Sequence, residues 1–292
     1  MGALVDAVLI PFVVGLASSA IVVLIGVRSI KEYIREGERR RNLGLLPEFW
    51  STPGGSKVFN VVFGAEWQGR EGEIEPRFGY AQAYGVSALI DCLGAVFDTR
   101  AVVRLIVVKK TDRLSSQLFE ENLVVFGGEE SISQFGAISK ALDVPYYQYK
   151  LDLNSRSFET PASRPPREVV CSDTKDGQLI ADIGTVTRLV NPSNRRLLVL
   201  FNGNYGAGLL GGVLAVTRNG PLLEGVKSTA TAQQLLVKVP DISNNIIDRT
   251  HTVEAVRGWV EFSPPAGAFQ RVTSGDAGLA NRGMQPTAQR SG

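Results

Sequence analysis

Two segments of the chain have the residue types that hold phosphate groups. In each, a short apolar run precedes glycines and the expected start of a helix: Asn122-Leu-Val-Val-Phe-Gly127-Gly128-Glu129-Glu130-Ser131 and Leu197-Leu-Val-Leu-Phe-Asn202-Gly203-Asn204-Tyr205-Gly206-Ala207-Gly208. Glycines let a phosphate approach the backbone N–H groups closely, and the helix dipole favours an anion at that end. Both segments therefore predict ligand contacts made by backbone amides.

The first turn, at Gly127-Gly128, has two interpretations. Glu129-Glu130 stands where a phosphate would lie, and its negative charge would repel one. The same carboxylates stabilise a helix start through its dipole, so that the turn needs no ligand. Alternatively, they hydrogen-bond the hydroxyls of a ribose. Ser131 and Gln134 have the spacing of a capping box, which predicts the start of a helix.

The second turn has no acidic residue. Gly203, Gly206 and Gly208 give the order G-x-x-G-x-G, which is neither a Walker A loop nor the dinucleotide motif G-x-G-x-x-G. Tyr205 either stacks on a base or packs against the domain, while Gly211-Gly212 is expected to permit close packing of helix on sheet. The two turns together predict these ligand-binding residues: Gly127, Gly128, Ser131, Asn202, Gly203, Asn204, Tyr205 and Gly206.

The paired motifs resemble those of Rossmannoid nucleotide-sensing domains of the SLOG type. The resemblance covers the layout of residues 58–262 and departs from the pattern at Glu129-Glu130. It implies a nucleotide-derived ligand and a sensor or effector role in bacterial signalling or defence, where such domains are often joined to membrane segments.

Acidic residues offer an enzymatic alternative. Glu66, Glu71, Glu73 and Glu75 follow the first expected strand, and loops at the carboxyl ends of strands often hold active-site groups. A nucleotide hydrolase that cleaves a glycosidic bond would need one such acid near a ribose. A solvated acidic loop explains the cluster equally well. Carboxylates outside this loop include Asp91, Asp98, Asp173 and Asp182.

Other catalytic and metal chemistry has little support. The single histidine, His251, lies in a polar stretch and is expected to be an exposed loop residue. The chain has no G-x-S-x-G motif, and Cys92 and Cys171 are far apart. Two cysteines and one histidine do not form a Cys or Cys/His metal site.

The hydrophobic pattern predicts strands alternating with helices. We expect strands at 58–63, 101–108, 122–126, 146–153, 179–189, 197–201 and 253–262, and helices at 79–97, 131–142, from the second turn to about 219, and at 230–236. Residues 155–176 are expected to be an exposed connection. The alternation predicts an α/β fold, a Rossmann-like three-layer sandwich with a mostly parallel sheet.

The N-terminal segment predicts a membrane anchor. Residues 7–27 contain no charge, and about 20 apolar residues suffice for a helix to cross a bilayer. Lys and Arg are concentrated after this run, which places the N-terminus outside and the domain in the cytoplasm at the inner membrane. The alternative is a cleaved signal peptide. The basic residues between 28 and 41 either bind anionic lipid or only stop translocation.

The remaining segments and the composition complete the expected organisation. Residues 43–57 are expected to form a linker that gives a domain at 58–263 reach, and residues 264–292 a disordered tail. The net charge of +2 includes the basic run after the anchor, so the domain is close to neutral and no nucleic-acid partner is expected. The sequence identifies no cofactor. It leaves open a second copy of the chain as a partner, and a membrane scaffold without a ligand as a third function.

Overall fold

The computed structural model describes residues 37–38, 41–68, 75–77, 79–98, 100–128, 131–150, 156–161, 164, 166–218, 220–242 and 251–274. The expected anchor at 7–27 and the pair Glu129-Glu130 lie outside these ranges. The chain divides into two compact units, residues 1–44 and residues 45–292, and the fold below is that of the second unit.

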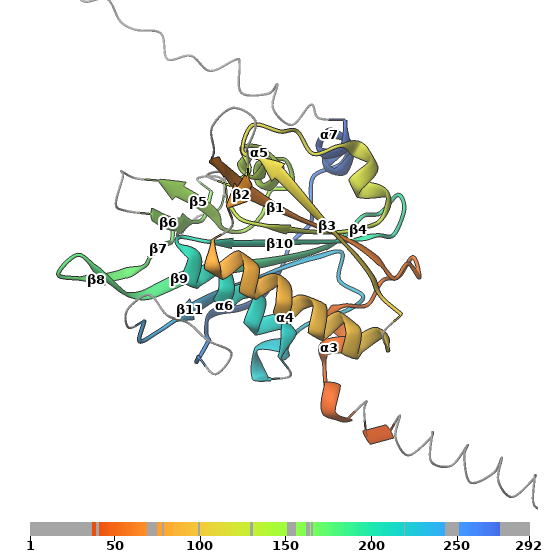
Figure 1. Cartoon of the computed structure of the whole chain (residues 1–292), viewed down its shortest axis with the longest axis horizontal. Coiled ribbons are helices and arrows are strands. Elements are labelled where there is room, and N and C mark those ends of the chain that lie inside the picture. Colours follow the sequence, from red (N-terminus) through yellow and green to blue (C-terminus); the bar gives the residue numbers. More distant parts are fainter. Residues whose placement is uncertain are drawn as a thin grey trace, which may run out of the picture. The chain divides into compact units, whose positions relative to one another are not determined.

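A mixed nine-stranded sheet forms the centre of this unit (Figure 1). Its parallel part contains, in spatial order, β3 (Val102–Lys109), β1 (Val58–Gln68), β4 (Asn122–Phe126) and β10 (Leu197–Gly203). Its antiparallel part continues with β9 (Gln178–Val190), β11 (Ala232–Val239) and β12 (Glu254–Glu261). β2 (Glu75–Arg77) pairs with the end of β1, and β8 (Asp173–Lys175) pairs with β9. The expected α/β class is confirmed, with a parallel half and an antiparallel half.

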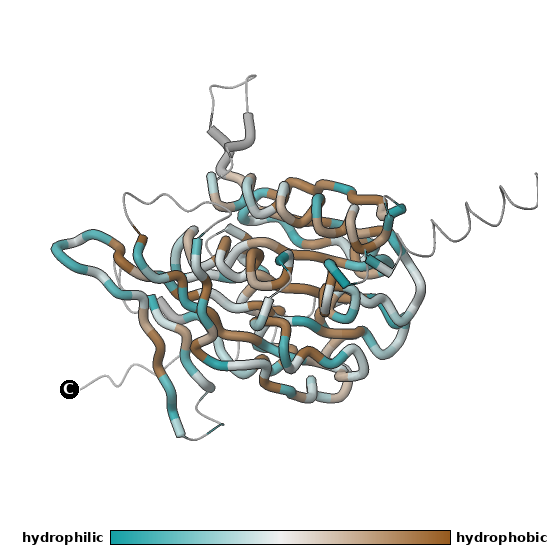
Figure 2. The backbone as a smooth tube through the Cα atoms, turned by 90° about the horizontal axis from the view of Figure 1, so that it is seen from below, coloured by the Kyte–Doolittle hydropathy of each residue, from teal (hydrophilic) through white to brown (hydrophobic). Residues whose placement is uncertain are grey.

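Helices pack on both faces of the sheet because successive strand residues point to opposite sides. On one face, α4 (Tyr80–Phe97) and α6 (Gly206–Thr217) lie side by side (Figure 1). On the other, α5 (Gln134–Ala141) and α7 (Ala268–Thr273) pack in one apolar cluster with residues of β1, β4 and β10. Hydrophobic residues dominate the central strands, as Figure 2 shows.

Glycines bring α6 into direct contact with β9. A Cβ added at Gly208 would lie 2.0 Å from the carbonyl oxygen of Ile183, and one at Gly184 would lie 1.9 Å from that of Gly208. A Cβ added at Gly211 would lie 2.3 Å from the Val239 Cγ2 atom on β11. The expected packing role of Gly211-Gly212 is confirmed. The glycine-rich segment was expected to be a loop from Asn202 to Gly212 that runs into a helix. The helix already begins at Gly206.

Two predicted elements were wrong. The expected helix at 230–236 is strand β11, because Gln233 and Gln234 are buried polar residues whose carboxamides are satisfied inside the protein. The Gln234 Oε1 atom accepts from the Tyr146 N–H at 2.8 Å. The expected connection at 155–176 contains β6 (Arg156–Glu159), β7 (Val169–Cys171) and β8, and β6 pairs with β5 (Tyr147–Lys150) in a separate three-stranded sheet.

The expected linker at 43–57 needs a correction. Most of this segment belongs to the domain, since α3 (Leu46–Phe49) lies inside it and the side chains of Phe49 and Trp50 are fully buried. The expected tail at 264–292 needs a similar correction, because α7 buries Phe269 and Val272 in the core. In the described part of each segment, a few apolar residues reach the core.

One helix among the described residues, α4, is long and apolar enough to cross a membrane. It packs on α6 and buries Leu89 and Leu93 completely, so its apolar character serves the domain core. The span at 7–27 stays a prediction.

The remaining short elements are two 3-10 helices, η2 (Ser116–Glu120) and η3 (Pro221–Leu223). The first of them leads into β4, and its Phe119 is buried. The second follows α6 and contacts it.

Candidate functional site

The two glycine turns meet at the carboxyl edge of the parallel strands. The Gly127 N–H donates to the Phe201 carbonyl at 2.9 Å, which places the end of β4 beside the end of β10. The helices α4, α5 and α6 all begin at this edge, where ligands of open α/β sheets commonly bind. The structure thus brings the predicted residues of both turns together.

The first turn folds back onto the end of β1. The Gly128 carbonyl accepts from the N–H groups of Ser131 and Ile132, both at 3.0 Å. Gly127 has a φ of 118°, and a Cβ there would lie 2.9 Å from the Ser131 Cβ. On β1, a Cβ at Gly64 would lie 2.1 Å from the Ser131 carbonyl oxygen. These glycines therefore permit contacts within the protein itself.

The predicted capping box at this turn does not form. α5 begins at Gln134, three residues later than expected, and its N-cap Ser133 makes no capping bond with its side chain. Gln134 Oε1 instead accepts from the Leu114 N–H at 2.7 Å. The expected inner face of the helix is confirmed, since Ile132, Phe135, Ile138 and Leu142 are all buried.

Two carboxamides converge beside Gly128. A Cβ at Gly128 would lie 2.4 Å from Gln148 Oε1 and 2.6 Å from Asn202 Oδ1. Gln148 Nε2 donates to the Gly203 carbonyl at 2.7 Å, and Asn202 Oδ1 accepts from the Gly203 N–H at 2.8 Å. An adjacent cavity of about 20 Å³, lined by α5, β5 and Asn202, has room for about one water molecule.

The amides of the second turn already hold an anion, the carboxylate of Asp182 on β9. Its Oδ2 accepts from the N–H groups of Tyr205 at 3.1 Å and Gly208 at 2.5 Å. Its Oδ1 accepts from the Ser172 hydroxyl at 2.7 Å and the Ile183 N–H at 2.8 Å. The carboxylate is completely buried, so it fills the position that the sequence predicted for a phosphate.

Burial and hydrogen bonding oppose each other at Asp182. Burial disfavours the charged form and raises the pKa of this carboxyl, which is the largest effect. Hydrogen bonds from Ser172, Gly208, Ile183 and Tyr205 lower the pKa and offset part of that rise. The pKa of Asp182 is therefore raised above its ordinary value.

Asn204 is turned into the protein. Its side chain is fully buried, its Nδ2 donates to the Ser172 hydroxyl at 3.1 Å, and its N–H donates to the Ile183 carbonyl at 2.9 Å. Within the described part of the chain, Asn204 Oδ1 has no hydrogen-bond partner. The backbone carbonyl of Asn204 accepts from the guanidinium of Arg156 at 2.7 Å. This asparagine therefore orders the turn from inside.

The outer side of the same turn reaches the surface, where Gly206 is exposed. Arg156 places its guanidinium carbon 5.0 Å from the centroid of the Tyr205 ring, in a cation–π contact. The N–H groups of Gly206 and Ala207 have no hydrogen-bond partner among the residues that the structure describes. The N-cap residues of α4 and α6, Gly79 and Tyr205, make no capping bond with their own side chains.

The starts of α4 and α6 are neighbours. A Cβ at Gly206 would lie 3.2 Å from the Ala81 Cβ, so the two N-termini nearly touch. Tyr80, the first residue of α4, is 59% exposed and stacks on Tyr84 with ring centroids 5.7 Å apart. This edge thus combines two helix N-termini, an arginine and an exposed aromatic ring.

Sequence reasoning missed four contributors to this edge: Tyr80, Gln148, Arg156 and Asp182. Asp182 is one carboxylate among many in the sequence, and it lies on β9, which runs antiparallel to β10. Arg156 begins β6 in a segment that was expected to be an irregular connection. No local spacing relates either residue to the second turn, and only the pairing of strands brings them there.

The acidic groups of the enzymatic alternative lie at the carboxyl end of β1, on β2 beside it, or outside the described residues. Glu66 belongs to β1, where its backbone is paired with Arg77 of β2, while Glu71 and Glu73 are outside those residues. His251 is half-buried, and its Nε2 is 3.1 Å from the Pro240 carbonyl oxygen. No group of three or more His, Cys, Asp or Glu side chains suited to a metal occurs in the described part.

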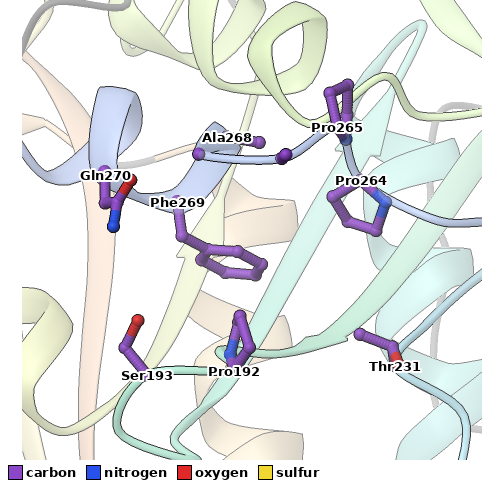
Figure 3. Close-up of a pocket in the computed structure, with 10 residues that line it drawn as sticks. Pro192, Ser193, Thr231, Pro264, Pro265, Ala268, Phe269 and Gln270 are labelled. Carbon is purple, nitrogen blue, oxygen red and sulfur yellow. The ribbon is translucent and has the colours of Figure 1, made fainter.

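A second hollow lies at the opposite end of β10, next to the start of α7 (Figure 3). It has a volume of about 160 Å³ and is lined largely by apolar groups, among them Pro192, Pro264 and Phe269. None of its lining residues is charged, and an ionised ligand would find no partner there. This hollow does not suit a nucleotide.

No protein-family model matches the chain, and no curated protein matches it either.

Proposed function

We propose that this chain is a membrane-anchored cytosolic domain that binds a nucleotide or a related small anionic ligand, in signalling or defence. We further propose that the domain is a Rossmann-like three-layer sandwich. The main support for ligand binding is one arrangement: the N-termini of α4 and α6 lie side by side next to Arg156, and the Gly206 and Ala207 N–H groups take no part in the bonds to Asp182. The exposed ring of Tyr80 at the same edge provides a surface for a base.

The charge at this edge favours an anion. Each helix N-terminus contributes about half a positive charge, and Arg156 contributes one more. The buried Asp182 carboxylate offsets part of the positive charge at the start of α6. Because the Gly206 and Ala207 N–H groups are uncapped, a phosphate would supply the acceptors that these helix starts lack.

The aromatic side chains favour a nucleoside attached to that anion. Tyr80 stacks on Tyr84 through one face, and over half of its surface is exposed. Aromatic rings offer sequence-tolerant stacking to any base, worth about 1–3 kcal/mol per base in nucleic-acid complexes. The proposed site therefore lies on the outer side of the second turn, and the buried amides of Tyr205 and Gly208 support it from below.

The membrane part of the proposal depends on the sequence. The uncharged run at 7–27 has the length of a span, and the basic residues after it favour an orientation with the domain on the cytoplasmic side.

Ligand binding can be tested by thermal unfolding of the detergent-solubilised full chain with ATP, ADP, NAD or pyrophosphate. A ligand at about 100 times its Kd stabilises the folded state by about 2.7 kcal/mol, which raises the Tm. We expect Arg156→Gln to lose the shift with every phosphate compound, and Tyr80→Ala to lose it for nucleotides more than for pyrophosphate. Arg104→Gln, at an exposed arginine on β3, is the matched control and should keep the shift. If no compound raises the Tm at millimolar concentration, the proposed function is wrong.

A further inference from the structure

A short segment before β1 is bound firmly to the domain. This strap, residues 45–51, buries the Phe49 and Trp50 side chains completely. Trp50 Nε1 donates to the Val216 carbonyl near the end of α6 at 2.8 Å. Arg188 Nε, on β9, donates to the Phe49 carbonyl at 2.8 Å. The strap therefore holds α6 and β9 together at one end.

Arg188 both favours and opposes the docking of the strap, because its hydrogen bonds to the strap come with the desolvation of a cation. The arginine is fully buried, and in the described residues it forms no ion pair within 4.0 Å. Its NH1 nitrogen has no hydrogen-bond partner there. Burial lowers the pKa of the guanidinium to about 10, a sign that desolvation outweighs the favourable charge of Glu48. Carbonyl groups of the strap compensate for only part of that desolvation, and release of the strap would let water reach the cation.

The elements that the strap holds are also those that form the candidate site. On β9, Arg188 contacts the strap and Asp182, six residues earlier, accepts from the start of α6. On α6, Val216 contacts the strap and Gly208 contacts Asp182. The close approach of Gly184 to Gly208 joins the two elements between these points. A shift of α6 along β9 would therefore disturb both ends.

We propose that the strap is a regulatory element: its docking and ligand occupancy of the carboxyl edge are linked through α6 and β9. The ligand part of this inference rests on the proposed function. Linkage is reciprocal, so that a ligand strengthens docking of the strap and a docked strap strengthens ligand binding by the same factor. The strap directly follows the unit at residues 1–44, so an event that pulls on the chain there reaches the site through the strap.

The first test needs no ligand. Hydrogen exchange is measured on the full chain for the wild type and for Trp50→Phe, which loses the hydrogen bond to Val216 but keeps an aromatic ring. We expect faster exchange at the strap and also at residues 204–209, at the far end of α6. Phe269→Leu in α7, on the other face of the sheet, controls for a general loss of stability. Arg188→Met is a second variant if Trp50→Phe folds poorly.

The second test uses pyrophosphate and ATP as probes. We expect a saturating probe to slow exchange at residues 45–51, and Trp50→Phe to bind it at least about five-fold more weakly than wild type. If the wild type binds both probes but the strap variant binds them equally well, the linkage is wrong and the proposed function stands. If the wild type binds neither probe, the proposed function fails. Exchange confined to the strap in the first test overturns the mechanical link itself.

Discussion

At the scale of single residues, Asp182 controls the geometry of the candidate site. Its carboxylate receives four donors, two of which are the backbone amides at the start of α6. A helix start that needs an anion obtains one from a neighbouring strand, so the turn keeps its shape without a ligand. The outer amides of Gly206 and Ala207 are then held in position for a ligand.

Removal of this carboxylate should destabilise the protein and expose a new anion site. In Asp182→Ala, the buried amides of Tyr205 and Gly208 lose their acceptor, and we expect a loss of about 1–3 kcal/mol in the free energy of unfolding. Formate or acetate in the buffer should restore part of it by occupying the vacated position. Urea denaturation with and without formate measures both effects. Asp173→Ala, at an exposed ion pair with Lys238, should change stability by less than about 1 kcal/mol and show no rescue.

The raised pKa of Asp182 predicts a pH dependence. Between the ordinary value of 3.8 and the raised pKa, the folded state binds more protons at this carboxyl than the unfolded state. Its contribution to stability is therefore fully present below pH 3.8 and is lost as the pH rises through the folded-state pKa. Urea titrations from pH 4 upward should show this slope in the wild type and not in Asp182→Asn. Identical slopes for both proteins would contradict the assignment.

At the scale of elements, the contact between α6 and β9 depends on the absence of side chains. Gly184 and Gly208 face each other so closely that a Cβ on either would meet backbone atoms, which cannot move aside as a flexible side chain can. This contact sets the distance between the helix and the strand, and with it the position of the second turn.

A pair of glycine substitutions tests that contact. We expect Gly184→Ala to lower the free energy of unfolding by about 1–3 kcal/mol, because the added methyl overpacks the interface. Gly94→Ala in α4 has open space around its Cβ, and it should raise stability by up to about 1 kcal/mol because alanine favours the helix. Chemical denaturation of the two variants gives changes of opposite sign if the contact is as tight as described. A neutral effect at Gly184 would show that α6 can move away from β9.

Regular elements could be predicted from the sequence because their own residues carry the signal. In α4, apolar residues recur at helical spacing, and in β1 and β4 continuous apolar runs end at glycine. β11 was missed because its two buried glutamines find their partners outside the strand. Gln234 bonds Tyr146 and Thr187, and Gln233 bonds Gly225 and Lys227. The same reason applies to the site. Glycines of both turns could be found locally, whereas Arg156 and Asp182 arrive through strand pairing that no spacing records.

At the scale of the whole molecule, the two cysteines provide a test of the proposed membrane orientation. Cys171 is exposed on β7, whereas Cys92 is buried in α4, where desolvation raises its pKa to about 12. Only Cys171 should react rapidly with a thiol reagent, since the thiolate is the reactive form.

This difference gives an orientation test. A reagent that cannot cross membranes should leave Cys171 unlabelled in intact cells and label it after lysis, because we expect the domain to be cytosolic. Cys171→Ser should abolish the labelling in lysed cells, and mass spectrometry of the chain measures it. Rapid labelling in intact cells would contradict the predicted orientation.

The strap also determines how far the domain can travel. If residues 7–27 cross the membrane, only the 17 residues from 28 to 44 separate the span from the folded unit that begins at Leu45. Fully extended, they reach about 60 Å, whereas a tether that ended at residue 57 would reach about 100 Å. A shorter tether would confine the domain to a thinner layer beside the membrane. It would also raise the effective concentration of the domain toward other molecules held at the membrane surface. Release of the strap would lengthen this tether. The same release that we propose to alter the site would therefore increase the volume that the domain can reach.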